Sequence, residues 1–177
     1  MLLAAAEILD QGIALLEAVS RDQYTTAVPP AFDSTPGAHY RHCLDHFTSF
    51  MAGTAGCQIN YDQRQRDPLL EHDSFAAANL SRRIKESLAR LPASTLARSV
   101  TVRSKVLYQG AFTQEVESTI ARELMYVVAH AMHHFALIRV MANLQGISLP
   151  ANFGVAPSTV RHGEQAAGKQ AAGRQGN

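Results

Sequence analysis

The stretch that most limits how this chain can fold is residues 118–145, the longest and most apolar part of the sequence. Its apolar spacing predicts one long helix, and Gly146 follows it, since glycine is common just beyond a helix C-terminus. Within it, "HAMHHFALI" places the three histidines His130, His133 and His134 among apolar residues. The predicted helix therefore carries imidazoles in an apolar setting.

A second group of three histidines lies in "HYRHCLDHF", residues 39–47, so the two stretches hold six of the eight histidines. Ser34 or Thr35 could cap a helix here, with Pro36 in its first turn, where a missing N–H costs nothing. We predict that this helix spans about residues 36–55.

The rest of the chain predicts two more helices and one hairpin. Apolar residues at helical spacing indicate helices at 2–20 and 73–91, while 58–73 is polar and predicts mostly loop. Alternating valines and a Gln-Gly turn predict a β-hairpin near 98–117. The expected fold is therefore all-α: an up-and-down four-helix bundle with a small β-hairpin insert between the third and fourth helices.

Length and composition restrict the remaining possibilities. The 177 residues suit one domain, expected over 1–160, and the polar segment 161–177 is expected to form a flexible tail. The net charge of +1, without a basic stripe, argues against nucleic-acid binding. No stretch reaches the roughly 18–20 continuous apolar residues expected of a membrane span.

The N-terminus and the cysteines indicate a cytoplasmic protein. Glu7 and Asp10 interrupt the apolar beginning of the chain, which also lacks the positive charges of an export signal. Cys43 and Cys57 form no CxxC pattern and indicate no disulfide framework.

The histidines fall at spacings that suit a metal ion. A helix turns about 100° per residue, so residues four apart share a face. His130 and His134 have this spacing, as do His42 and His46. Two histidines at i and i+4 bind one ion in zincin helices. His133 points to the other side of His130, and His39 precedes His42 by three.

One shared ion would satisfy several imidazoles that are otherwise costly to bury. Imidazole suits zinc, nickel, copper or iron, and a three-histidine site with an open position would activate water or a thiol. A di-iron carboxylate site needs an acidic residue three before a histidine, which no histidine here has. Cys43 lies about 100° from His42 on its helix and is expected to be a small buried residue.

Candidate catalytic residues lie near both clusters. Glu123 is seven before His130, on the same helical stripe, and could orient a ligand or act as a base. The segment "NYDQRQRD" holds Tyr61 and Arg64, followed by Arg66 and Asp67. It could hold an anionic or polar substrate, or form a solvated loop.

The motifs "GAHYRHCLDHF", "NYDQRQRD" and "RELMYVVAHAMHHFALI" resemble the DinB superfamily of YfiT-like bundles, which is unrelated to the translesion polymerase of similar name. The resemblance covers about residues 1–160. It implies four helices and a divalent ion, Zn²⁺ or Ni²⁺, bound by one histidine of the second helix and an HxxxH pair of the last. Matched to this plan, the ligands are His42, His130 and His134, with His46 as an alternative or additional ligand.

The resemblance leaves the reaction open. Several members of the superfamily are similar in using a low-molecular-weight thiol in S-transfer, which favours a metal-dependent transferase or hydrolase that activates a thiol or water on a small-molecule substrate. The alternative is a non-catalytic metal-binding or stress-response protein. A metal-free dimeric scaffold is a third hypothesis, and a homodimer is compatible with all three.

Overall fold

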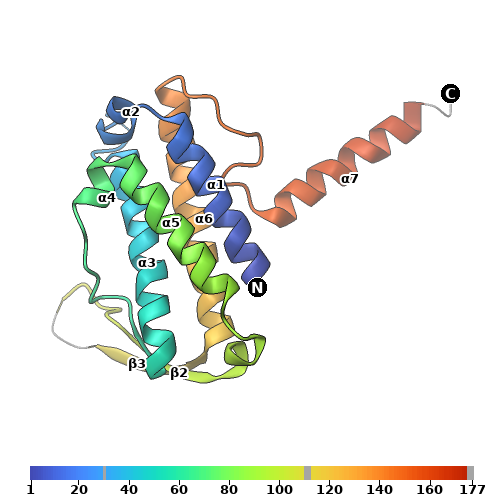
Figure 1. Cartoon of the computed structure of the whole chain (residues 1–177). Helices are drawn as coiled ribbons and strands as arrows, with labels where there is room; N and C mark the ends of the chain where they lie inside the picture. Colours follow the sequence, from blue (N-terminus) through green and yellow to red (C-terminus); the bar gives the residue numbers. More distant parts are fainter. Residues whose placement is uncertain (30, 110–112, 175–177) are drawn as a thin grey trace.

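Four long helices lie side by side in the computed structural model, which describes residues 1–29, 31–109 and 113–174 (Figure 1). They are α1 (Leu2–Ala18), α3 (Pro36–Gly56), α5 (Ser74–Ala89) and α6 (Ile120–Leu144). The helix α3 packs on α6 and α5, while α1 packs on α5 and α6. The mostly helical fold is therefore confirmed, and all four long helices lie where the sequence predicts them.

The ends of α3 and α6 follow from local sequence. Thr35 caps α3 by accepting a hydrogen bond from the Ala38 amide at 2.9 Å, and Pro36 occupies the first turn. Thr119 caps α6 in the same way through the Arg122 amide at 3.2 Å. Gly146 follows α6 with a φ of +70°, a conformation that glycine adopts readily.

The predicted hairpin is confirmed, and it belongs to a larger sheet. Strands β2 (Ser99–Ser104) and β3 (Gln114–Thr119) pair antiparallel, with Val102 opposite Val116. A third strand, β1 (Gln58–Asn60), pairs parallel with β2. The fold is therefore mostly helical with a small three-stranded sheet, in which β1, directly after α3, extends the predicted hairpin. The predicted hairpin turn includes residues 110–112, which lie outside the described residues.

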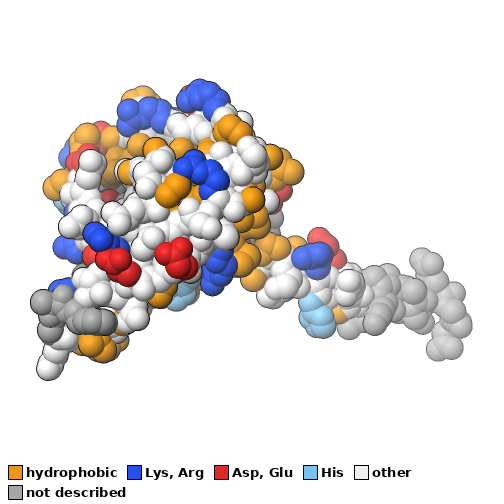
Figure 2. All heavy atoms as spheres, turned by 90° about the horizontal axis from the view of Figure 1, so that it is seen from below, with side chains coloured by type: hydrophobic (Ala, Val, Ile, Leu, Met, Phe, Trp, Pro, Cys, Tyr) orange, Lys and Arg blue, Asp and Glu red, His pale blue; other side chains and the backbone are white. Residues whose placement is uncertain are grey.

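Short elements complete the chain: α2 (Arg21–Thr25), α4 (Leu69–His72) and the 3₁₀ helix η1 (Ala93–Ala97). The C-terminal segment, expected as a tail without regular structure, is helical as α7 (Pro157–Arg174) and extends away from the four long helices (Figure 1). Its flexibility stays a prediction. On the face shown in Figure 2, basic and acidic side chains are interspersed.

The helix α6 packs against two other long helices, α3 and α1. Among the described helices, α6 is the one that is long and apolar enough to suit a membrane span when only length and hydropathy are considered. Core helices of soluble proteins can share this property. Here Leu124, Val127, Phe135 and Ile138 are buried in the core. Contacts with α1 and α3 thus account for its apolar character.

The segment after α6 folds back onto it beside the histidines. The rings of Phe135 and Phe153 stack with centroids 5.0 Å apart, and Tyr40 of α3 stacks on Phe135 at 5.8 Å. Gly154 has a φ of +65°, and a Cβ there would lie 2.6 Å from the Phe135 carbonyl carbon. Only glycine fits this approach, which fixes the part of α6 next to His134.

We expect Gly154→Ala to lower the free energy of unfolding by about 2 kcal/mol or more, because left-handed backbone strain adds to an overpacking clash. Urea unfolding followed by circular dichroism measures this. Gly56→Ala is the matched control: no atom lies within 4 Å of its added Cβ, so alanine should be neutral or stabilising. Equal stability of the two variants would contradict this account of Gly154.

Candidate metal site

Three histidines from two helices converge where α3 packs on α6. His42 and His46 come from α3, and His130 comes from α6. One ring nitrogen of each lies within 4.8 Å of those of the other two, so these three histidines could hold a metal ion. The i, i+4 spacing on α3 places its two imidazoles on one face, and helix packing brings His130 opposite them.

The His42 and His130 rings are in direct contact. Their Nε2 atoms lie 2.9 Å apart, as in a hydrogen bond. The ring centroids of His46 and His130 are 4.1 Å apart. The imidazoles thus form one continuous cluster across the interface between α3 and α6.

His134 lies at the edge of this cluster. Its ring centroid is 4.6 Å from that of His42 and 4.7 Å from that of His130. Its Nδ1, however, lies 2.9 Å from Nδ1 of His39. The described geometry therefore brings His46 closer to the shared centre than the sequence plan implied, and it pairs His134 with His39. His133 is exposed on the outer side of α6.

Arg64 reaches the cluster from the segment after β1. Its Nη1 lies 2.9 Å from Nδ1 of His42 and 3.0 Å from Nε2 of His46. The guanidinium Nε is buried and has no hydrogen-bond partner among the described residues. The sequence proposed Arg64 as a substrate-binding candidate, and the structure places it on the histidines themselves.

Two tyrosines form the wall of the site on the side of the sheet. The Tyr61 ring stacks on His46 with centroids 5.2 Å apart, and Tyr126 stacks on His130 at 5.7 Å. The Tyr61 hydroxyl donates to Oε2 of buried Glu123 at 3.0 Å, while Ser118 donates to Oε1 at 2.7 Å. Glu123 therefore fixes Tyr61 rather than touching a histidine.

Burial keeps the clustered histidines neutral. It lowers the pKa of His42 to about 4 and that of His46 to about 2. The pKa of His134 falls to about 3 for the same main reason. Arg64 and the neighbouring imidazoles act in the same direction, since positive charges so close repel one another. Neutral imidazole is the form that binds a metal ion.

The donor set fits a divalent cation. The ligand candidates are imidazoles, which suit zinc or nickel. Nδ1 of His46 is buried without a hydrogen-bond partner in the described part of the chain, so the described protein groups do not satisfy the cluster completely. Cys43 is buried in the apolar core and does not belong to the group of His42, His46 and His130, which agrees with its predicted role as a small buried residue.

Small pockets open next to the histidines on two sides. One of about 250 Å³ is lined by Ser34, Ala38, His39, Arg41, His42 and His134. Another of about 400 Å³ lies behind Tyr61, Tyr126 and Glu123, against the sheet. The first pocket reaches two histidines directly, whereas the second is separated from them by the tyrosines.

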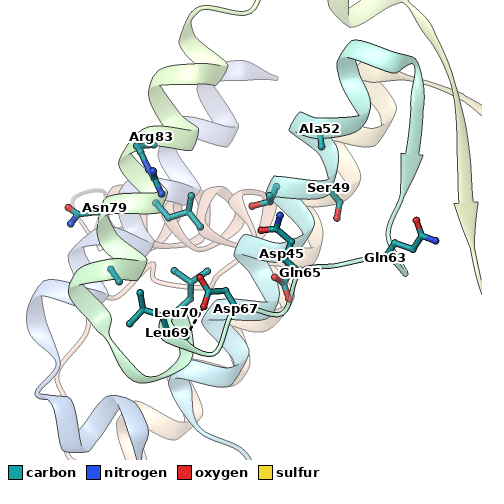
Figure 3. Close-up of a pocket in the computed structure, with 13 residues that line it drawn as sticks. Asp45, Ser49, Ala52, Gln63, Gln65, Asp67, Leu69, Leu70, Asn79 and Arg83 are labelled. Carbon is teal, nitrogen blue, oxygen red and sulfur yellow. Dashed lines mark hydrogen bonds between the residues drawn. The ribbon is translucent and has the colours of Figure 1, made fainter.

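A larger pocket, about 520 Å³, contains no histidine and lies between α3, α5 and the segment before α4 (Figure 3). Asp45, Gln65, Asp67 and Arg83 are among its lining residues. Arg41 holds the buried Asp45 carboxylate at 2.8 Å and Glu71 at 2.9 Å. We place the candidate site at the histidines, because chemistry rather than volume identifies a reactive centre.

Sequence reasoning missed two contacts of the site. Tyr126 lies four before His130, so the same helical spacing that paired the histidines would have found it. The contact between His39 and His134 could not be found this way, because it depends on the rotation of α3 against α6. Arg66 and Asp67, proposed beside Arg64, are exposed, and Asp67 lines the 520 Å³ pocket instead.

Solved structures with the same arrangement of elements are DinB-like proteins. One is YjoA of Bacillus subtilis, with a TM-score of 0.65 over 86% of this chain and 96% of that one, at 17% identity. A DinB-like protein of Bacillus cereus gives a TM-score of 0.58 over 81% of this chain and 89% of that one, at 14% identity. The chain has the DinB-like fold. The DinB-like arrangement agrees with the resemblance that the histidine motifs indicated.

Sequence comparison finds similarity to one curated protein over part of the chain. No family model matches the chain. FK506-binding protein 5 of Rhizopus delemar is 31% identical over 104 residues, which is 59% of this chain. The aligned part covers 27% of that fungal protein, so the chain spans only about a quarter of its relative's length. This similarity over part of each sequence transfers no activity to the present chain.

We expect the chelator-treated protein to lose stability as the pH falls from about 6.5 toward 4. In this window the unfolded chain binds protons at histidines whose folded pKa is lowered, so the free energy of unfolding decreases; well above pH 6.5, where these histidines are neutral in both states, they contribute no slope. Urea unfolding at pH 7, 6 and 5 measures the effect. His46→Gln should reduce the slope, and an unchanged stability of the wild type between pH 7 and 5 would contradict the buried neutral state.

Proposed function

We propose that the protein binds a divalent ion, Zn²⁺ or Ni²⁺, at the histidine cluster and uses it to activate a low-molecular-weight thiol or water. The observation that carries this proposal is the convergence of His42, His46 and His130 nitrogens within 4.8 Å. Several uncharged imidazoles gathered within this distance favour a cation that would satisfy them together.

His42 and His130 are common to both ligand sets that we propose. The resemblance of the sequence to the DinB superfamily supports His134 as the third ligand, whereas the side-chain geometry supports His46. Three protein ligands would leave a coordination position free for substrate, which is the arrangement of catalytic rather than structural sites.

The chemistry supplied by a bound ion would be Lewis-acid activation, in which the pKa of a coordinated thiol or water falls. The pocket beside His42 and His134 gives a small molecule access to these imidazoles. Arg41 borders this pocket, and its charge is shared with Asp45 and Glu71. On the other side, Tyr61 and Tyr126 cover the cluster and limit access of water.

The proposed residues differ in role. Glu123 would act as a positioning residue, because it holds the Tyr61 hydroxyl that packs against His46. Its contacts support this role better than that of a base at the ion. A non-catalytic metal-binding protein is the alternative, and it shares the same ligand set.

We expect His42→Ala and His130→Ala each to weaken Zn²⁺ binding by more than about 10–100-fold, the loss typical of removing a residue that only hydrogen-bonds to a ligand, since each variant removes a ligand itself. Competition with a chromophoric chelator, on protein purified without a histidine tag, measures this. His133→Ala is the matched control, because its exposed imidazole lies on the same helix. Wild-type protein that binds no Zn²⁺ or Ni²⁺ would overturn the proposed function.

The third ligand is decided by comparing His46→Ala with His134→Ala in the same assay. The geometry leads us to expect the larger loss of Zn²⁺ affinity from His46→Ala, because a ring nitrogen of His46 lies within 4.8 Å of those of His42 and His130. A larger loss from His134→Ala would instead favour the ligand set implied by the resemblance.

Enzyme and binder are separated by offering the Zn²⁺-loaded and Ni²⁺-loaded protein a panel of low-molecular-weight thiols with an electrophilic acceptor. Thiol consumption that disappears in His130→Ala is the expected result. A metal-loaded protein that is inactive on all of them, and toward hydrolysable esters, favours the non-catalytic alternative.

A further inference from the structure

We propose that Arg64 is an internal cation that competes with the metal ion for the imidazole nitrogens and thereby sets how tightly the site loads. This inference rests on the proposed metal-binding function. Its basis is the position of the guanidinium, whose Nη1 lies 2.9 Å from His42 and 3.0 Å from His46.

The arginine determines which ring nitrogens carry protons. A guanidinium is always charged and only donates, so Nδ1 of His42 and Nε2 of His46 must both accept. The proton of neutral His42 is then on Nε2, and it is donated to Nε2 of His130. Arg64 thus fixes a chain of hydrogen bonds. In this chain the acceptor lone pairs of His42, His46 and His130 are all already engaged.

A metal ion needs the same lone pairs. Coordination by Nε2 of His46 requires the electrons that Arg64 now engages. Coordination by Nε2 of His42 would move its proton to Nδ1, where it would face the N–H of Arg64, and two donors cannot bond to each other. Charge repulsion between a guanidinium and a divalent ion acts in the same direction. Arg64 and the ion are therefore mutually exclusive on this cluster.

The segment that carries Arg64 is held at its two ends and exposed between them. Asn60 accepts from the amides of Asp62 and Gln63, and Asp67 accepts from the Leu69 amide. Gln65 and Arg66 between these anchors are exposed, and Gln65 lies beside Asp45 at the large pocket (Figure 3). Arg64 can therefore leave the histidines without breaking the anchors on either side.

The guanidinium is also incompletely bonded where it lies. Its Nε is buried without a hydrogen-bond partner in the described residues, and its contacts at the cluster are to neutral imidazoles rather than to a carboxylate. A buried donor without a partner raises the free energy of this arrangement. Less free energy is therefore needed for a metal ion to displace the guanidinium.

The test compares Zn²⁺ affinity of wild type, Arg64→Met and Arg66→Met by chelator competition. Met keeps an apolar stem of similar length and removes the charge, and Arg66 offers the same substitution two residues away at an exposed position. We expect Arg64→Met to bind at least about tenfold more tightly, equivalent to about 1.4 kcal/mol, and Arg66→Met to stay within about twofold of wild type.

Equal or weaker binding by Arg64→Met would overturn the competition while leaving the proposed metal site intact. Wild type and Arg64→Met that both bind no Zn²⁺ would instead overturn the proposed function, and this inference with it. A second measurement needs no variant: trypsin should cleave after Arg64 faster in Zn²⁺-loaded than in chelator-treated wild type, with the cleaved bond identified by mass spectrometry. Slower cleavage there on loading would contradict release of Arg64.

Discussion

The contact between α3 and α6 is the interaction on which the rest of this structure depends. Each helix has an apolar face interrupted by imidazoles, and packing the two faces together buries His46 while it brings His42 against His130. Imidazoles without partners are costly in an apolar interior, so the interface is stable only where these groups satisfy one another or share a cation. The stacked rings of Tyr40, Phe135 and Phe153 fix the helices at this spacing.

The helices and the histidine pairs could be predicted from sequence because they depend on local periodicity and capping. Thr35 and Gly146 limit α3 and α6 through groups within a few residues. The strand β1 could not be predicted, because three residues carry too little pattern and its pairing with β2 is distant in sequence. Helix α7 was not predicted, because its segment is polar and lacks the apolar periodicity that indicates a packed helix.

The sequence predicted which histidines belong to the site better than it predicted how their rings are arranged. Spacing identified His42, His46, His130 and His134, but which nitrogens meet depends on how α3 is rotated against α6. The role of Arg64 was interpreted as substrate binding, because a sequence shows charge and not the direction of a side chain. The packing of α3 on α6 brings these histidines face to face, and the DinB-like fold, shared at 14–17% identity, does not specify a reaction.

The central claim is that the clustered imidazoles together hold one cation, and X-ray absorption spectroscopy on the Zn²⁺-loaded protein tests it most directly. The account predicts a first shell of nitrogen or oxygen at about 2.0 Å with the multiple scattering of several imidazoles. Sulfur scattering at about 2.3 Å, which would indicate Cys57 or Cys43 as a ligand, or a shell without imidazole scattering, would contradict it.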